Sequence, residues 1–387
     1  MYQKLISGSK PKAHAATRAR AEILWGLAAV SEAAPAVESG IEDLDIAPPP
    51  AATAVEVAPR IRWLRAPLSG VVDHVNCWIL DDGDAWTIVD FGASSGEVRT
   101  AWRTLLDRLL AEKPVRRLVA THGHSDHVGH AGSIAARLGL PLHATRTEWL
   151  VAAFRRGEAR SEFPEYVTSF FERHGCDSDH ARSYAEARLR WATEVDEIPP
   201  LIRIRAGDRL TMGGRTWEVF TSGGHSPEAA SFWAADDRIL IAGDHLLARS
   251  SPTLAISPAE PDADPLGDYL ASLSQFDDLP DDTLVLPSHG RPYRGIRSRI
   301  RELRHHHEQR LARVLAAVDV PKTAMEVAAI VYPRVIADGR ARLAFSEAIG
   351  RLNHLVATGA VVCVDDVDRR RFVRREATTG SRDVAAE

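Results

Sequence analysis

The chain has few cysteines and no long apolar run. Its 387 residues include only three cysteines, Cys77, Cys176 and Cys363, at wide spacings. An odd number of scattered cysteines forms neither a disulfide framework nor a thiolate zinc site, so we expect reduced thiols and a cytoplasmic protein. No uninterrupted apolar segment reaches the roughly 18 residues that a membrane helix requires, and we therefore expect no spanning segment.

An excess of charge of one sign is also missing. The formal net charge is -5, from 48 Lys and Arg against 53 Asp and Glu, which creates no global field toward nucleic acid or an anionic membrane. The 45% of hydrophobic residues suffices for one large α/β domain and a smaller one. We expect a small-molecule substrate and no membrane partner, with nucleic acid and a homodimer kept as alternatives.

The N-terminal part is predicted to lie outside the compact domain. Residues 14–32 are rich in Ala and Arg with a helical rhythm, and a Pro/Ala/Glu-rich stretch follows, which predicts a helix and a flexible linker over residues 1–59. The first acidic residue is Glu22, so the basic start resembles a targeting segment as much as an ordinary amphipathic helix.

Strand and helix patterns alternate from residue 60 onward. RIRWLRAP, VNCWILDDG and WTIVDFG predict strands, with Asp82-Gly83 as a hairpin turn between the last two. A helix over 97–112 and the buried strand RRLVAT follow, and a second series of strands ends at TLVLP. This alternation predicts one α/β domain over residues 60–295, with a polar helical insert at 148–195.

The C-terminal part is predicted to be a separate module. A charged helix over 296–320 leads into helices and two short strands over 321–376, an order typical of a winged-helix module, and 377–387 is predicted to be a disordered tail. The basic run at 369–371 lies beside Asp365, Asp366 and Asp368, so the predicted wing is not a cleanly basic surface. We favour a module that walls the pocket or mediates dimerisation over one that grips RNA.

The segment THGHSDHVGHAG, residues 121–132, is the densest set of candidate metal ligands. His122, His124, Asp126 and His127 fall within six residues, directly after a predicted buried strand. Imidazoles and a carboxylate are the ligands that zinc accepts when no cysteine is present, and a loop at a strand end can aim all four at one point. An exposed loop that is merely rich in histidine would leave Asp126 and the strand unexplained, so we predict a metal site.

Four further segments, together with H-x-H-x-D-H at 122–127, resemble the motifs of the metallo-β-lactamase superfamily. GHSP carries His225, ILIAGDHL contains Asp244, LVLPSHGRP carries His289, and WTIVDFGAS places Asp90 in the early D-x-G segment, where it is expected to support a ligand. The order is that of the family. The resemblance implies an α/β fold, an αββα sandwich with a C-terminal winged-helix domain, close to the glyoxalase II-like and β-lactamase-like endoribonuclease branch.

The resemblance also implies two metal ions, taken as Zn2+ with iron or manganese as alternatives. Two such ions lower the pKa of a bridging water, and the resulting hydroxide attacks a carbonyl or phosphorus. Asp126 is assigned the catalytic role of orienting that water. The implied ligands are His122, His124 and His225 for one ion, Asp126, His127 and His289 for the other, and Asp244 for both.

The bridging Asp244 narrows the implied reaction. True β-lactamases of the superfamily usually lack it, whereas esterases, thioesterases, lactonases and nucleases of the fold have it. We hypothesise hydrolysis of a small ester, thioester or lactone, with a metal-dependent endoribonuclease and a mononuclear iron persulfide dioxygenase-like enzyme as alternatives. Glu228 stands where many members have Gly, so the loop after His225 is expected to differ in shape.

Other polar and aromatic groups are given structural roles. The histidines at 305–307 are predicted to lie on a solvated helix face, since adjacent helical residues cannot all reach one ion. Arg155, Arg156 and Arg160 of the insert are expected to pair with neighbouring acids, with an anionic substrate as the alternative. Five aromatic residues are predicted to form the core of the insert: Trp149, Phe154, Tyr166, Phe170 and Phe171.

Overall fold

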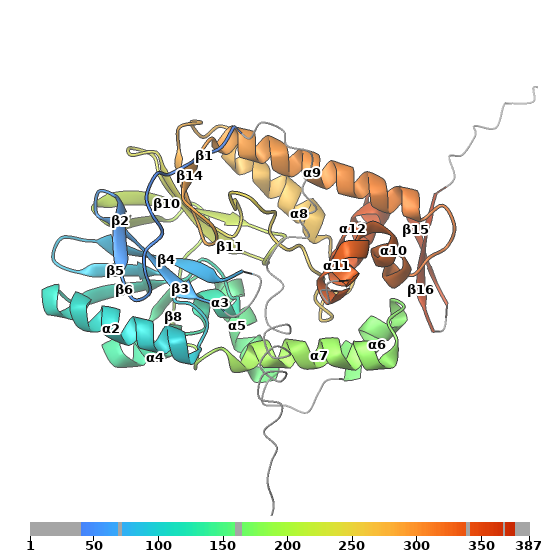
Figure 1. Cartoon of the computed structure of the whole chain (residues 1–387), viewed down its shortest axis with the longest axis horizontal. Coiled ribbons are helices and arrows are strands. Elements are labelled where there is room, and N and C mark those ends of the chain that lie inside the picture. Colours follow the sequence, from blue (N-terminus) through green and yellow to red (C-terminus); the bar gives the residue numbers. More distant parts are fainter. Residues whose placement is uncertain (1–39, 69–71, 159–164, 338–340, 367, 376–387) are drawn as a thin grey trace, which may run out of the picture.

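The structure, a computed structural model, describes residues 40–68, 72–158, 165–337, 341–366 and 368–375 (Figure 1). The helix predicted at 14–32 and the tail at 377–387 lie outside these residues. The linker predicted up to residue 59 is wrong at its C-terminal end, because β1 (Glu42–Asp43) and β2 (Ala54–Ala58) join the two main sheets. An edge strand forms by hydrogen-bonding to the free backbone groups of its neighbour. The amino-acid composition of β1 and β2 therefore did not indicate strands.

Two sheets of seven strands form the centre of the molecule. The first has the order β2-β3-β4-β5-β6-β7-β8 and the second β1-β14-β13-β12-β11-β10-β9. The bounds in the first sheet are β3 Ile61–Pro67, β4 His74–Asp81, β5 Trp86–Val89, β6 Val115–Val119, β7 Leu142–Ala144 and β8 Leu201–Arg203. Those in the second are β9 Arg209–Met212, β10 Arg215–Ser222, β11 Ala229–Ala234, β12 Ile239–Gly243, β13 Leu284–Pro287 and β14 Tyr293–Arg294.

The central sheets are buried on both faces, as the apolar run from Cys77 to Leu80 in β4 shows. Cys77 and Ile79 face the helices that cover the first sheet, whereas Trp78 and Leu80 face the second sheet. Successive side chains of a strand point to opposite faces, so burial of both faces favours runs of consecutive apolar residues. Trp78 stacks on Trp63 of β3 with 6.4 Å between ring centroids.

Helices cover the outer face of each sheet. The helices α2 (Gly96–Glu112) and α4 (Ala131–Leu138) lie on the first sheet, and α8 (Pro265–Ser272) and α9 (Ile296–Ala317) lie on the second. Figure 1 shows these layers as helix, sheet, sheet and helix. The predicted αββα sandwich is confirmed.

Two helical units lie at one side of the sandwich and share a core. The insert contains α5 (Arg146–Glu158), α6 (Glu165–Arg173) and α7 (Ser178–Thr193). The C-terminal module contains α10 (Ala324–Val331), α11 (Pro333–Ala337), α12 (Ala341–Ala357), β15 (Val361–Asp365) and β16 (Arg370–Arg374). Phe170 and Phe171 of the insert are buried in one cluster with Phe345 and Phe372 of this module. The element order agrees with a winged helix, and that assignment remains a prediction.

Two predictions about side-chain burial in these units are wrong. Phe154 and Tyr166 were expected in the insert's core but are 52% and 40% exposed, because only one face of each helix is covered. His307 was expected on a solvated face but is fully buried beside Tyr269, since α9 packs on both the sandwich and the C-terminal module. Within the described ranges, no helix has the length and apolar composition to cross a membrane.

Candidate metal centre

The first part of the site is the loop that follows β6. The short helix α3 (Ser125–Val128) begins at once after His124 and presents Asp126 and His127 from its first turn. A Cβ atom at Gly123 would lie 2.4 Å from the carbonyl oxygen of Glu148, so the position between the first two histidines admits only glycine. The loop is therefore pressed against α5, and its ligands are held at the end of the strand.

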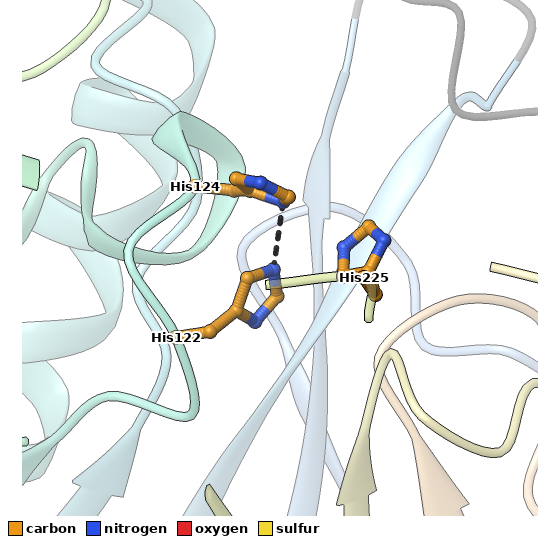
Figure 2. A group of neighbouring side chains, drawn as sticks. All are labelled: His122, His124 and His225. Atoms are coloured by element: carbon orange, nitrogen blue, oxygen red, sulfur yellow. Dashed lines mark hydrogen bonds between the residues drawn. The ribbon is translucent and has the colours of Figure 1, made fainter. Parts of the chain in front are cut away.

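Three predicted ligands form one cluster, shown in Figure 2. His122 Nε2 and His124 Nδ1 lie 3.0 Å apart, and the ring centroids of His124 and His225 are separated by 4.5 Å. One nitrogen from each of the three rings lies within 4.8 Å of the others. His225 comes from the loop between β10 and β11, so the two sheets supply the cluster jointly.

The other three predicted ligands form a second cluster. Asp126 Oδ2 lies 3.4 Å from Nε2 of His127 and 3.4 Å from Nε2 of His289. His289 follows β13 of the second sheet, while the other two come from α3. All three side chains are at least nine-tenths buried.

Asp244 lies between the clusters. Its Oδ2 is 3.1 Å from His225 Nε2 and 4.0 Å from His122 Nε2. Its Oδ1 is 3.5 Å from His127 Nε2 and 3.4 Å from His289 Nε2. One carboxylate oxygen thus faces each cluster, which is the placement that a ligand shared by two ions requires.

The unsatisfied polar atoms of these residues fit divalent cations. Both carboxylate oxygens of Asp126 and of Asp244 are buried without a hydrogen-bond partner among the described residues, as is Nε2 of His127, His225 and His289. Leaving such atoms unpaired costs roughly 1–3 kcal/mol each, more for charged groups, unless a ligand satisfies them. A donor set of imidazole nitrogen and carboxylate oxygen without sulfur suits zinc and similar divalent ions.

The pKa shifts of the histidines also fit a centre that binds cations. Burial lowers the pKa of His122 and His124 well below the usual histidine value, so both imidazoles are neutral and able to ligate. Burial acts in the same sense on His289, but the carboxylates of Asp244 and Asp126 overcome it and raise its pKa to about 10. These carboxylates thus favour a positive charge at this position, which a bound cation would supply.

Hydrogen bonds from Nδ1 orient three of the histidines. His127 Nδ1 donates to Asp90 Oδ2 at 2.8 Å, which is the supporting role expected for Asp90. His225 Nδ1 donates to the carbonyl of Thr253 at 2.9 Å, and His289 Nδ1 donates to the carbonyl of His74 at 2.8 Å. Each bond directs the lone pair of Nε2 into the centre. The two carbonyl partners were not predicted, because a backbone acceptor carries no signal in the sequence.

Glu148 is a further residue that the sequence did not single out. It is 1% exposed, and its Oε2 accepts hydrogen bonds from the Gly123 amide at 2.8 Å and from Ser226 Oγ. Its Oε1 accepts the Glu228 amide at 2.7 Å. Glu228 in turn accepts the amide of Thr147 at 3.2 Å, so the side chain that replaces the common Gly ties this loop to α5.

A cleft opens onto the centre. Its walls come from the metal loops, from residues 253–258, from the insert and from α12. The wall residues beyond the metal loops include Arg155, Phe171, Tyr184, Arg188, Ile256, Arg342 and Leu343. The insert and the C-terminal module therefore shape whatever reaches the metal centre.

A metal centre built from histidine and aspartate ligands of this kind is typical of a known protein family. A sequence model of the metallo-beta-lactamase superfamily matches residues 70–289, which include all seven predicted ligands, and the chain belongs to this superfamily. Its members are mostly metal-dependent hydrolases.

Two solved structures are similar to more than four fifths of the chain. The chain is 36% identical to a beta-lactamase domain protein from Burkholderia ambifaria, with a TM-score of 0.77 over 88% of this chain and 99% of that one. A metallo-beta-lactamase family protein from Thermus thermophilus is 27% identical, with a TM-score of 0.67 over 83% and 100%. An uncharacterized protein of Aquifex aeolicus is 26% identical over 56% of this chain and 84% of its own length.

Proposed function

We propose that the protein is a hydrolase with two divalent ions, taken as zinc, and that it cleaves a small ester, thioester or lactone. The observation that carries the proposal is the position of Asp244, whose two oxygens face the two histidine clusters. The resemblance associates this bridging residue with esterases, thioesterases and lactonases.

In this proposal, the protein ligands form two sets, one for each ion. His122, His124 and His225 hold one ion, and Asp126, His127 and His289 hold the other. When bound, such ions lower the pKa of a water molecule toward neutrality and polarise the carbonyl that it attacks. Asp126 lines the cleft as well as the metal centre, so its carboxylate would orient the attacking water.

The cleft selects the substrate in this proposal. Phe171, Ile256 and Leu343 line it as apolar surface that holds the acyl part and excludes bulk water from the carbonyl. Phe171 belongs to the insert and Leu343 to α12, which gives both added units a direct role in substrate binding.

The charges of the C-terminal hairpin disfavour RNA as the substrate. Arg370 lies 2.7 Å from Asp262, and Arg371 lies 3.9 Å from Asp366. Arginines that neighbouring carboxylates neutralise are poor contacts for phosphates. A mononuclear iron oxygenase is disfavoured for another reason, since the second cluster retains Asp126, His127 and His289 in facing positions.

The proposal is tested with zinc-loaded protein on a panel of thioesters, esters and lactones, alongside metal analysis. We expect turnover, about two zinc ions per chain, and loss of at least 100-fold in kcat/KM for Asp244→Asn, on the order of an interaction made to a reacting charge. Asp84→Asn, at an exposed surface pair, is the matched control. Turnover no higher than that of Asp244→Asn, one iron per chain, or cleavage of single-stranded RNA instead would overturn the proposal.

A further inference from the structure

We infer that Asn76 is a positioning residue of the metal centre, which fixes the loop at 287–290 so that His289 faces the other ligands of the second cluster. Asn76 lies in β4 of the first sheet, whereas this loop, called the His289 loop below, ends β13 of the second sheet. The inference rests on the proposed function, because it assigns Asn76 a role toward the ion that the second cluster holds in that proposal.

Asn76 is a polar residue at a position where the fold favours an apolar one. Its side chain is fully buried, on the same face of β4 as Trp78 and Leu80, which belong to the core between the two sheets. Burying an amide costs free energy unless its polar atoms are hydrogen-bonded, and an aliphatic side chain would avoid that cost. The contacts of Asn76 explain why an amide stands here.

The side-chain amide of Asn76 connects the two ends of the His289 loop. Its Nδ2 donates to the carbonyl oxygens of Pro287 at 2.7 Å and of Gly290 at 3.0 Å. Its Oδ1 accepts the indole Nε1 of Trp63 at 2.7 Å. Because an indole N–H can only donate, this bond fixes which end of the amide is the oxygen and leaves the NH2 group to hold the loop.

The backbone at the start of β4 holds the same loop between its two ends. The amide of Asn76 donates to the carbonyl of Ser288 at 2.6 Å. The carbonyl of His74 accepts Nδ1 of His289 at 2.8 Å, and Nε2 of His74 accepts the amide of Gly290 at 2.9 Å. Together with the side-chain bonds of Asn76, these contacts reach each residue of the His289 loop.

The His289 loop is also joined to the strand that leads to the bridging aspartate. The amide of Ser288 donates to the carbonyl of Gly243 at 3.0 Å, and Gly243 directly precedes Asp244. Asp244 Oδ1 lies 3.4 Å from Nε2 of His289. A displacement of the loop would therefore change the separation of these two ligands, and metal sites tolerate displacements of only about 0.5 Å.

Replacement of Asn76 by Leu isolates this role. Leucine has a similar size but leaves the indole of Trp63 and two carbonyl oxygens of the loop without the bonds that Asn76 supplies. Aspartate is less informative, because its negative charge would act on a nearby cation directly. The ligands themselves are unchanged in Asn76→Leu, so any effect on metal binding arises from their placement.

The first experiment measures the order of the His289 loop in metal-free protein by hydrogen–deuterium exchange. In Asn76→Leu the amides of 284–294 should exchange about 10-fold faster or more, since a segment that loses hydrogen bonds opens more easily. The matched control is Asn353→Leu, because Asn353 is also buried and its Nδ2 donates to the carbonyls of Pro261 and Ala263 at 2.9 Å each. This control should leave exchange at 284–294 unchanged.

The second experiment measures the zinc affinities by chelator competition. In Asn76→Leu we expect one ion to bind as in the wild type and the other about 10–100-fold more weakly, the usual loss when a residue that orients a ligand is replaced. Trp63→Phe removes only the donor that orients the amide, so it should weaken the same ion by less and tests the role even if Asn76→Leu does not fold. Its control is Trp86→Phe, because that indole donates to the carbonyl of Leu109 on α2.

The results distinguish this inference from the proposed function, because neither readout depends on catalysis. Faster exchange together with the selective weakening of one ion supports the role of Asn76. Unchanged exchange in Asn76→Leu, unchanged affinity for both ions, or an equal weakening of both ions in Asn76→Leu and Asn353→Leu overturns it. If the wild type binds two zinc ions and cleaves no ester, thioester or lactone, the proposed function fails and the selective effect of Asn76→Leu still stands.

Discussion

The carboxylate of Glu148 accepts a hydrogen bond from the hydroxyl of Ser226, with 2.5 Å between Oε2 and Oγ. The same oxygen accepts the amide of Gly123, and the other accepts the amide of Glu228. One buried side chain of α5 therefore joins the loop of the first two histidine ligands to the loop that bears His225. The insert is thus hydrogen-bonded to both of these ligand-bearing loops.

Replacement of Glu148 by Gln should weaken metal binding while the protein remains folded. Glutamine keeps the shape but places an NH2 group against donors that need an acceptor, which costs about 1–3 kcal/mol of stability. Metal affinity should fall about 10–100-fold, as for other residues that orient ligands. Chelator competition and the free energy of unfolding measure both effects. The exposed Glu56→Gln is the control, and equal metal affinity in the two variants would contradict this role.

Replacement of Asp90 by Asn should loosen the second cluster selectively. Asp90 has a φ of 62°, a left-handed conformation that asparagine tolerates, so the backbone should be preserved. The substitution removes the negative charge that accepts Nδ1 of His127, and we expect metal affinity to fall about 10–100-fold. Metal content after dialysis is the measurement. Asp107→Asn, at an exposed ion pair with Arg137, should keep the wild-type content.

Removal of the metal should destabilise the wild-type protein. The buried oxygens of Asp126 and Asp244 then have no cation, while stabilisation by a bound ion grows as RT ln(1 + [L]/Kd), about 4 kcal/mol at a thousandfold excess over Kd. We expect chelator to lower Tm by several degrees and added zinc to restore it. Asp244→Asn should show a much smaller zinc-dependent shift, and an equal shift would argue against this residue as a ligand.

Acid should destabilise the contact between the insert and the C-terminal module through His174. This residue is 1% exposed, donates from Nδ1 to the Phe170 carbonyl at 2.7 Å, and stacks on Phe372. Burial lowers its pKa from 6.5 to about 4. Between these two pKa values, the histidine binds a proton in the unfolded chain but not in the folded protein. The contribution of His174 to the free energy of unfolding is therefore full above pH 6.5 and declines as pH falls toward 4.

The effect of His174 is measured as a difference between pH values. The free energy of unfolding of metal-free protein at pH 7.5 and pH 5 should differ less in His174→Leu than in the wild type, by roughly 1–3 kcal/mol. His180→Leu, at an exposed histidine paired with Asp177, is the control. An identical pH dependence in His174→Leu and wild type would show that this histidine is not responsible.

The close approach of α12 to the segment at 253–257 should make a larger side chain at Gly350 destabilising. A Cβ atom there would lie 2.8 Å from the carbonyl oxygen of Leu254, next to the Thr253 carbonyl that orients His225. Gly350→Ala should lower stability by about 1–3 kcal/mol and weaken metal binding. Gly157→Ala, at a helical glycine with open space around it, should be neutral or slightly stabilising. Equal Tm values for the two variants would rule out a steric effect of position 350 on the segment at 253–257.

The αββα architecture was predictable because its signals are local. Strands with both faces buried contain apolar runs, such as Cys77–Leu80 in β4. The strands β1 and β2 escaped prediction because edge strands depend on their neighbours. Exposure of Phe154 and burial of His307 were mispredicted for a related reason, since burial depends on which helix faces another unit. Periodicity within one helix does not contain that information.

The candidate ligands could be identified from the sequence alone, because four of them follow one strand within six residues and the others stand in family motifs. The folded structure was needed to show that Asp244 faces both clusters and that Glu148 joins the loops of the first two histidines and His225. It was also needed to show that the insert and α12 line a cleft at the centre. The physical reason is that ligand identity is a property of side-chain chemistry at short spacing. Orientation, burial and convergence of charge arise only when distant segments pack together.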